Sequence, residues 1–258
     1  MWLFAAALVA RAAPDVVVDA IGRSIARDGV RAPIDELRAP LRAACAAGRA
    51  LACALAEAPL DQAGIAAAGA AACGVDGPAD PPADHPPADS AGCVLAAWGL
   101  LPPTGDGLDP THPTDPARYR SLVDRACGAG VVRGCVELGY VHLLGLATYP
   151  SVPAAAEYWA PACDAGDAHA CTALGLAASD PSRLRQGADG GDPTAWVALA
   201  ARDPATADAS LARACAGGVT RTCTAMALEA LAEAPASPAS APSPAPTGAG
   251  SDGTRGAS

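Results

Sequence analysis

One short pattern occurs twice in this chain, and it limits the possible folds more than any other feature. The first copy reads Ala-Cys-x-x-Gly from residue 126 and Cys-x-x-Leu-Gly from residue 135. The second copy reads the same from residues 162 and 171, which is a shift of 36 residues. Repeats of this length are typical of solenoids of stacked helix pairs. The sequence therefore predicts an all-α solenoid in which about six helix hairpins occupy most of the chain.

The cysteines repeat at one spacing, with seven residues between the two members of a pair. Four pairs share it: Cys45 and Cys53, Cys127 and Cys135, Cys163 and Cys171, and Cys215 and Cys223. In a helix hairpin, such positions fall in the last turn of the first helix and the first turns of the second, where they can face each other. Zinc binding would need closer cysteine pairs or added histidines, and independent free thiols would not explain a constant spacing. We therefore predict a disulfide in each of these hairpins.

Two units depart from the pattern. Cys73 and Cys93 have 19 residues between them because a proline-rich loop, residues 74–90, is inserted, and we predict that they form a fifth disulfide. In the other unit, Ala188 and Trp196 occupy the two cysteine positions. We expect the packing of Trp196 to hold that unit in place of a disulfide, which makes it the softest part of the array.

The composition indicates a thin core and excludes several functions. Much of the 51 % hydrophobic content is alanine and only 3 % of residues are aromatic, so each helix buries little apolar area. The chain contains no lysine, which excludes phosphate-loop, Schiff-base and Ser-x-x-Lys mechanisms. A net charge of -10 argues against nucleic acid or an anionic membrane as the partner.

The two ends of the chain differ from the repeats. An apolar run from Trp2 to Ala10, with the small-x-small sequence at residues 10–12, predicts a signal peptide over residues 1–13. No positive charge precedes this run, so a capping helix and a start codon placed too far downstream are the alternatives. We expect a capping helix at 14–32, the solenoid at 33–233 and a disordered Ala/Pro/Ser-rich tail at 234–258. The run is too short to span a membrane, and together with the cysteines it favours a secreted or periplasmic protein of a bacterial cell envelope.

The motif Ala-Cys-x-x-Gly followed by Cys-x-x-Leu-Gly resembles the Sel-like repeats (SLR), which are relatives of the tetratricopeptide repeats. The disulfide-bearing form of this family is called the Helicobacter cysteine-rich proteins. Tyr158 and Trp159 stand where the family has paired aromatic residues, and Gly145 stands where a second helix ends in glycine. The resemblance is strong over 117–178, fair over 205–231 and weak elsewhere. It implies a right-handed α/α solenoid and an association with penicillin binding and weak β-lactam hydrolysis.

We expect the chain to bind a protein or peptide partner in the cell envelope through a concave face lined by its first helices. Tyr119 and Tyr158 are the predicted partner-binding residues, because interfaces are enriched in aromatic side chains, whereas Trp159 is expected to pack between repeats. A weak β-lactam hydrolase and an envelope assembly factor that uses the repeats as a spacer are the alternatives. We expect a monomer without a membrane span, and no motif for a catalytic, cofactor-binding or metal-binding site occurs in the sequence.

Histidines and aspartates occur together in two loops, at residues 80–89 and 106–115. We expect these loops to be solvated rather than metal-bound. Prolines hold the first loop extended, and the second lacks the spacing of a helix-loop-helix calcium site. Of the remaining histidines, His142 is expected to pack in the core and His169 to lie exposed at a hairpin turn.

Overall fold

The computed structural model describes residues 35–59, 61–75, 89–104, 107–109, 111–219 and 222–226. Its helices are α2 (Asp35–Ala46), α3 (Ala50–Glu57), α4 (Gln62–Cys73), α5 (Ala91–Trp98), α6 (Pro116–Gly128), α7 (Val132–Leu144), α8 (Val152–Asp164), α9 (Ala168–Ala177), α10 (Pro181–Asp189), α11 (Pro193–Ala200), the 3-10 turn η1 (Pro204–Thr206) and α12 (Ala207–Ala216). Residues 222–226 are also helical. The predicted signal peptide, capping helix and tail lie outside the described residues, as does most of the 74–90 loop.

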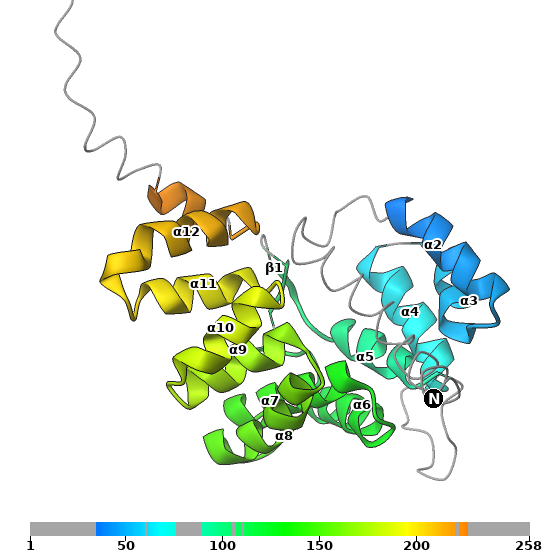
Figure 1. Ribbon diagram of the computed structural model, residues 1–258. Helices are drawn as coiled ribbons and strands as arrows, with labels where there is room; N and C mark the ends of the chain where they lie inside the picture. Colours follow the sequence, from blue (N-terminus) through cyan, green and yellow to red (C-terminus); the bar gives the residue numbers. More distant parts are fainter. Residues whose placement is uncertain are drawn as a thin grey trace, which may run out of the picture.

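Each helix packs against the next one along the chain, from α2 to α12. Figure 1 shows the result as a curved array, with α2–α5 at one end, α6–α8 in the middle and α9–α12 at the other end. The helices form six pairs, the last of which combines α12 with residues 222–226. The all-α solenoid predicted from the repeat is therefore confirmed.

The connection between α5 and α6 contains the two β-strands of the described segments. Strand β1 (Pro103–Thr104) pairs antiparallel with β2 (Gly107–Leu108). The sequence analysis missed this short hairpin, which lies between the second and third helix pairs.

All ten cysteines form disulfides, and the five bonds join the two helices of a pair as predicted. They are Cys45–Cys53, Cys73–Cys93, Cys127–Cys135, Cys163–Cys171 and Cys215–Cys223. The Cα atoms of the bonded residues are 4.5 to 4.9 Å apart, so the helix ends meet closely at each turn. Among the described residues, sixteen of the 39 buried hydrophobic side chains are alanine, which leaves a thin core that these covalent links reinforce.

The glycine of Ala-Cys-x-x-Gly has a geometric role, which it keeps in the pair where Ala188 replaces the cysteine. Gly48, Gly130, Gly166, Gly191 and Gly218 all end the first helix with φ between 83° and 99°. Glycine adopts this left-handed conformation without the steric cost that a Cβ would add, so the chain can reverse directly into the second helix.

The glycine of the Leu-Gly motif serves a different contact, between one pair and the next. A Cβ on Gly139 would collide with the indole of Trp159, and a Cβ on Gly175 would collide with Leu184. Trp159 and Leu184 stand four residues before Cys163 and Ala188 respectively, so they are equivalent positions of successive first helices. Trp159 is buried and its Nε1 donates to the Val136 carbonyl at 3.1 Å. The prediction that Trp159 packs between repeats is confirmed.

Much of the excess acidic charge has a structural use. The carboxylates of Asp61, Asp115, Asp167, Asp180, Asp192 and Asp203 each accept a hydrogen bond from a backbone N–H at the start of the following helix. Such N-caps satisfy donors that have no partner within the helix. Negative charge there also complements the helix dipole.

Candidate functional site

Polar and aromatic side chains connect the second helices of successive pairs, and they form the most organised polar arrangement among the described residues. At one junction the guanidinium of Arg133 lies 5.5 Å from the centre of the Trp98 ring. At the next junction the rings of Tyr140 and His169 lie 5.7 Å apart. Trp98 and Tyr140 both stand five residues after the second cysteine of their pair, while Arg133 and His169 both stand two residues before it. The same two repeat positions thus build both contacts.

Glu137 is a buried carboxylate at the first of these junctions. Its Oε1 accepts from Trp98 Nε1 at 3.2 Å and from Arg133 Nε at 3.0 Å. Its Oε2 accepts from the Tyr119 hydroxyl at 2.8 Å. The three donors come from α5, α7 and α6, so this one carboxylate ties the second helix pair to the third. Because both carboxylate oxygens accept hydrogen bonds and the negative charge of Glu137 is paired with Arg133, the arrangement is suited to holding helices together.

Tyr119 is therefore not a partner-binding residue, and that prediction is wrong. Its side chain has no exposed surface, and its hydroxyl is committed to Glu137. Burial and the neighbouring Glu137 charge raise the pKa of Tyr119 well above its ordinary value, so the phenol stays protonated. Tyr119, Val123 and Ala126 follow one another at helical spacing and are all fully buried. That stripe was the sequence signal for a core position.

The second junction is a chain of three groups from three helix pairs. The His169 Nδ1 lies 3.1 Å from Asp192 Oδ2, and its Nε2 lies 3.1 Å from the Tyr140 hydroxyl. Tyr140 also meets Trp159 edge to face, with ring centres 5.2 Å apart. His169 was expected to be simply exposed at a turn; its side chain is 38 % exposed, but both ring nitrogens are engaged.

The protonation states of this chain follow from its surroundings. Burial opposes ionisation of Asp192, but hydrogen bonds from His169 and Thr194 and the charge of His169 outweigh it and lower the pKa to about 2. Burial raises the pKa of Tyr140, with the Glu137 charge adding to the effect and Arg133 opposing it. Tyr140 is consequently a neutral phenol at physiological pH and lacks the activation that a nucleophile needs. The contacts of His169 with Asp192 and Tyr140 hold three helix pairs together, and this chemistry favours a structural link over covalent catalysis.

Tyr158, the second predicted partner-binding residue, is half-buried on α8. Its ring stacks on that of His142 from α7, with centres 5.1 Å apart and planes 13° apart. His142, expected in the core, is likewise half-buried. The two rings form a small aromatic surface between the third and fourth helix pairs.

The exposed large hydrophobic side chains of the described residues lie near helix ends where one pair is followed by the next, three of them between α7 and α8 and one in the last turns of α9. They are Leu144, Tyr149, Val152 and Leu176. Leu144 ends α7, Val152 begins α8, and Tyr149, which is 90 % exposed, lies in the loop between them. We call Leu144, Tyr149 and Val152 the junction edge. The loop 145–151 carries no charged residue, which was the available sequence signal for an apolar surface.

The described part of the second histidine- and aspartate-containing loop is held by local hydrogen bonds. Asp109 accepts from Thr111 and lies 3.2 Å from His112 Nδ1, whereas Asp115 caps α6. Within the described part of the chain, no three His, Cys, Asp or Glu residues come together as a metal site would require. Residues 80–88 lie outside the described part.

No helix among the described residues has the length and apolarity needed to cross a bilayer. Comparison with known proteins returns no matching family model, no matching curated sequence and no matching solved structure. The fold and the side-chain geometry are therefore the basis for any functional conclusion. The five disulfides indicate an oxidising, extracytoplasmic compartment.

Proposed function

We propose that this chain is an exported Sel-like repeat protein that binds a protein or peptide partner in the cell envelope. Support for the family comes from the shared glycine, alanine and cysteine positions, each of which has a defined role in the helix pairs. Support for export comes from the five disulfides and from the apolar run before residue 13. A secreted or periplasmic location follows from this proposal.

The observation that carries the binding function is the junction edge. Tyr149, Leu144 and Val152 expose apolar surface on adjoining helix ends and the loop between them, and among the described residues the other exposed large hydrophobic side chain is Leu176. Exposed apolar groups that gather in one place mark interaction surfaces more often than single exposed residues do. Tyrosine supplies a large contact area with few rotatable bonds, so it is a frequent anchor at interfaces. The fitting partner presents apolar side chains in an extended or helical segment.

Tyr158 remains a proposed partner-binding residue, but it is the less clean probe. Because its ring stacks on His142, replacing it removes packing as well as surface. Tyr149 makes a better test, since a side chain that is 90 % exposed contributes little to folding. The substitution Tyr149→Ser should leave thermal unfolding unchanged.

A library of random peptides displayed on phage provides a defined probe. We expect the disulfide-intact protein to enrich apolar sequences, and Tyr149→Ser to weaken the best synthetic peptide about tenfold in titration calorimetry. Exposed Arg185 on α10 offers the control, because Arg185→Ser should leave the same Kd unchanged. Equal binding by wild type and Tyr149→Ser, or failure to enrich any peptide, would refute the junction edge as a binding surface.

Weak β-lactam hydrolysis stays a prediction of the family resemblance, without a supporting contact among the described residues. The chain has no lysine to serve the Ser-x-x-Lys route. Turnover of a chromogenic cephalosporin by purified protein would favour this alternative over a binding module.

A further inference from the structure

The pair α10–α11 is the described pair that no disulfide closes. Ala188 and Trp196 take the cysteine positions, and the pairs on either side are closed by Cys163–Cys171 and Cys215–Cys223. Trp196 packs on the cluster that Leu184 and Ala188 of α10 form with α11, so packing takes the place of the missing bond. The guanidinium of Arg213 on α12 lies 4.5 Å from the centre of the Trp196 ring and links α11 to the next helix. Noncovalent contacts must hold the remainder of this pair to its neighbours.

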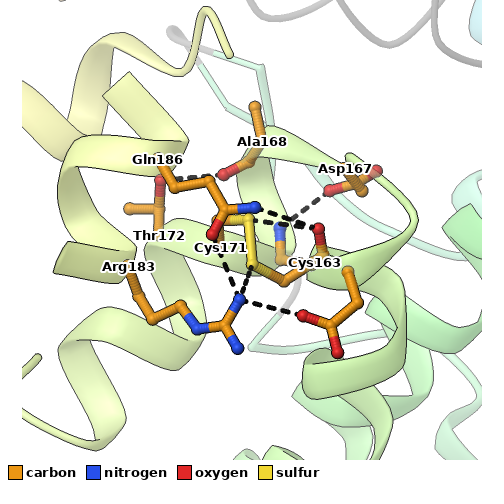
Figure 2. The surroundings of a disulfide bond; sticks show 9 residues. Cys163, Asp167, Ala168, Cys171, Thr172, Arg183 and Gln186 are labelled. Atoms are coloured by element: carbon orange, nitrogen blue, oxygen red, sulfur yellow. Dashed lines mark hydrogen bonds and ion pairs between the residues drawn. A yellow bond between two sulfur atoms is a disulfide. The ribbon is translucent and has the colours of Figure 1, made fainter. Parts of the chain in front are cut away.

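One end of α10 is fastened to α8 by two polar side chains, as Figure 2 shows around the Cys163–Cys171 disulfide. Arg183 Nη1 lies 2.9 Å from Asp164 Oδ1 and 3.3 Å from Cys163 Sγ. Gln186 Nε2 donates to the Cys163 carbonyl at 3.4 Å. These two side chains fasten α10 to the last turn of α8 beside the disulfide.

The turn between α10 and α11 is fastened to α9 by Asp192. Its Oδ1 accepts from the Thr194 backbone N–H at 2.9 Å and from the Thr194 hydroxyl at 2.6 Å, which caps α11. Its Oδ2 lies 3.1 Å from His169 Nδ1. Asp192 is only 7 % exposed, so this ion pair is shielded from solvent on the carboxylate side. Oδ1 thus makes a contact within the pair α10–α11, and Oδ2 links this pair to α9.

His169 is the group of this contact that can respond to pH. Histidine changes charge between pH 5 and 8, and the partly exposed ring can exchange protons with solvent. Around it lie the Asp192 carboxylate from the α10–α11 turn, the Tyr140 phenol from α7, and Asp167, which caps its own helix. The charges of Arg133 and Glu137 act on the Tyr140 phenol. Described residues of α8 and α10 add no ion pair to the imidazole. Carboxyl and phenol side chains ordinarily change charge outside the interval from pH 5 to pH 8.

We propose that the His169–Asp192 contact is a pH-responsive latch that closes the unstapled pair α10–α11 more firmly when His169 is protonated. With a neutral ring, Nδ1–H donates to Asp192 and the Tyr140 hydroxyl donates to Nε2. After protonation, Nε2–H donates to the Tyr140 oxygen, and the bond to Asp192 becomes an ion pair. No hydrogen bond is lost and one becomes charge-assisted. The additional closure is present at acidic pH and lost as the pH rises through the histidine range.

The consequence is a C-terminal end of the array that opens more often in alkaline surroundings. Opening of α10–α11 would release α12 from α11 or α9 from α10, because the main packing of these helices is on their sequence neighbours. The closed pairs beside it would be unaffected, because disulfides hold them at every pH. The latch is independent of the proposed binding function at the junction edge.

Native-state hydrogen exchange, corrected for the intrinsic pH dependence of exchange, measures this opening directly. In the disulfide-intact chain we expect backbone amides of α10 and α11 to open about fivefold less often at pH 5.5 than at pH 8, because a charge-assisted bond replaces a neutral one. Amides of the stapled pair α8–α9 serve as the internal reference and should show no such ratio. A ratio near one for α10–α11 would overturn the proposal.

The variant His169→Gln separates the latch from other effects of pH. Glutamine can still donate to Asp192 but carries no charge at any pH, so the pH-dependent ratio should disappear while the pair stays folded. Persistence of the ratio in this variant would also overturn the proposal. If the variant does not fold, the NMR titration of the His169 Cε1–H in wild-type protein decides. Protonation in the closed pair supports the latch, and an imidazole that stays neutral down to pH 5 refutes it.

Discussion

Adding the disulfide that the fifth pair lacks should stabilise it by an amount that the other pairs define. In α8–α9, the Cα atoms of Cys163 and Cys171 are 4.6 Å apart at a sequence separation of 8. Ala188 and Trp196 occupy the same repeat positions at the same separation. The double substitution Ala188→Cys with Trp196→Cys should therefore form a sixth bond, since this spacing suits disulfide geometry.

The magnitude follows from the closed loop, which contains nine residues as in four of the native bonds. Loop-closure entropy gives about 2.5 kcal/mol for a loop of this length. Loss of the Trp196 ring and its contact with Arg213 opposes the gain, so the reference must lack the ring as well. The matched control is Ala188→Ser with Trp196→Cys, which cannot form the bond.

Hydrogen exchange of α10 and α11 is the assay, because it reports opening of this pair without unfolding the others. Relative to the control, the double-cysteine variant should slow opening of the pair about 60-fold, which corresponds to 2.5 kcal/mol. Two free thiols under oxidising conditions would show that Ala188 and Trp196 are not equivalent to the cysteines. An intact bond without added protection would show that loop closure does not limit this pair.

Three further predictions concern the buried carboxylates and the disulfides. Glu137→Ala should lower the free energy of unfolding in urea by about 3 kcal/mol, because it leaves Trp98, Tyr119 and Arg133 without their buried acceptor. The control Glu157→Ala, on the exposed side of α8, should change that free energy by less than about 0.5 kcal/mol, and equal effects of the two substitutions would contradict the network. The pKa of Asp192 is lowered from 3.8 to about 2, so its contribution is complete above pH 4 and lost as the pH falls toward 2. A urea series from pH 4 to pH 2 should show wild type losing about 2 kcal/mol more stability than Asp192→Asn loses, and parallel curves would exclude the contribution. Under limiting reductant, peptide mass mapping should find that the half-buried disulfides open before the buried ones. The half-buried bonds are Cys45–Cys53, Cys127–Cys135 and Cys215–Cys223, and the buried bonds are Cys73–Cys93 and Cys163–Cys171. The reverse order would mean that solvent access does not control reduction.

The features that sequence reasoning predicted correctly are those set within one helix pair. The turn glycines, the cysteines and the small residues between them lie within about a dozen positions, so their spacing alone defines the hairpin. The same overlay placed Ala188 and Trp196 in the cysteine positions of the unstapled pair. Even the 19-residue interruption between Cys73 and Cys93 did not hide the fifth bond.

The features that it missed arise between pairs. Which face of α6 meets its neighbours decides that Tyr119 is buried, and that face is set by contacts with α5 and α7. The link from His169 to Asp192 crosses 23 residues, and the repeat positions that build it become visible only when α7 and α9 are seen side by side. The junction edge depends on how far α7 and α8 extend beyond their last buried turn.

The central claim is that disulfides close successive helix pairs, and disulfide mapping of the unreduced protein tests it most directly. After digestion and alkylation without reduction, mass spectrometry should find five cross-linked peptides joining Cys45 to Cys53, Cys73 to Cys93, Cys127 to Cys135, Cys163 to Cys171 and Cys215 to Cys223. It should find no alkylated cysteine. Ten alkylated cysteines in protein taken from its own cell, or bonds that cross between pairs, would contradict the stapled solenoid and the extracytoplasmic location that rests on it.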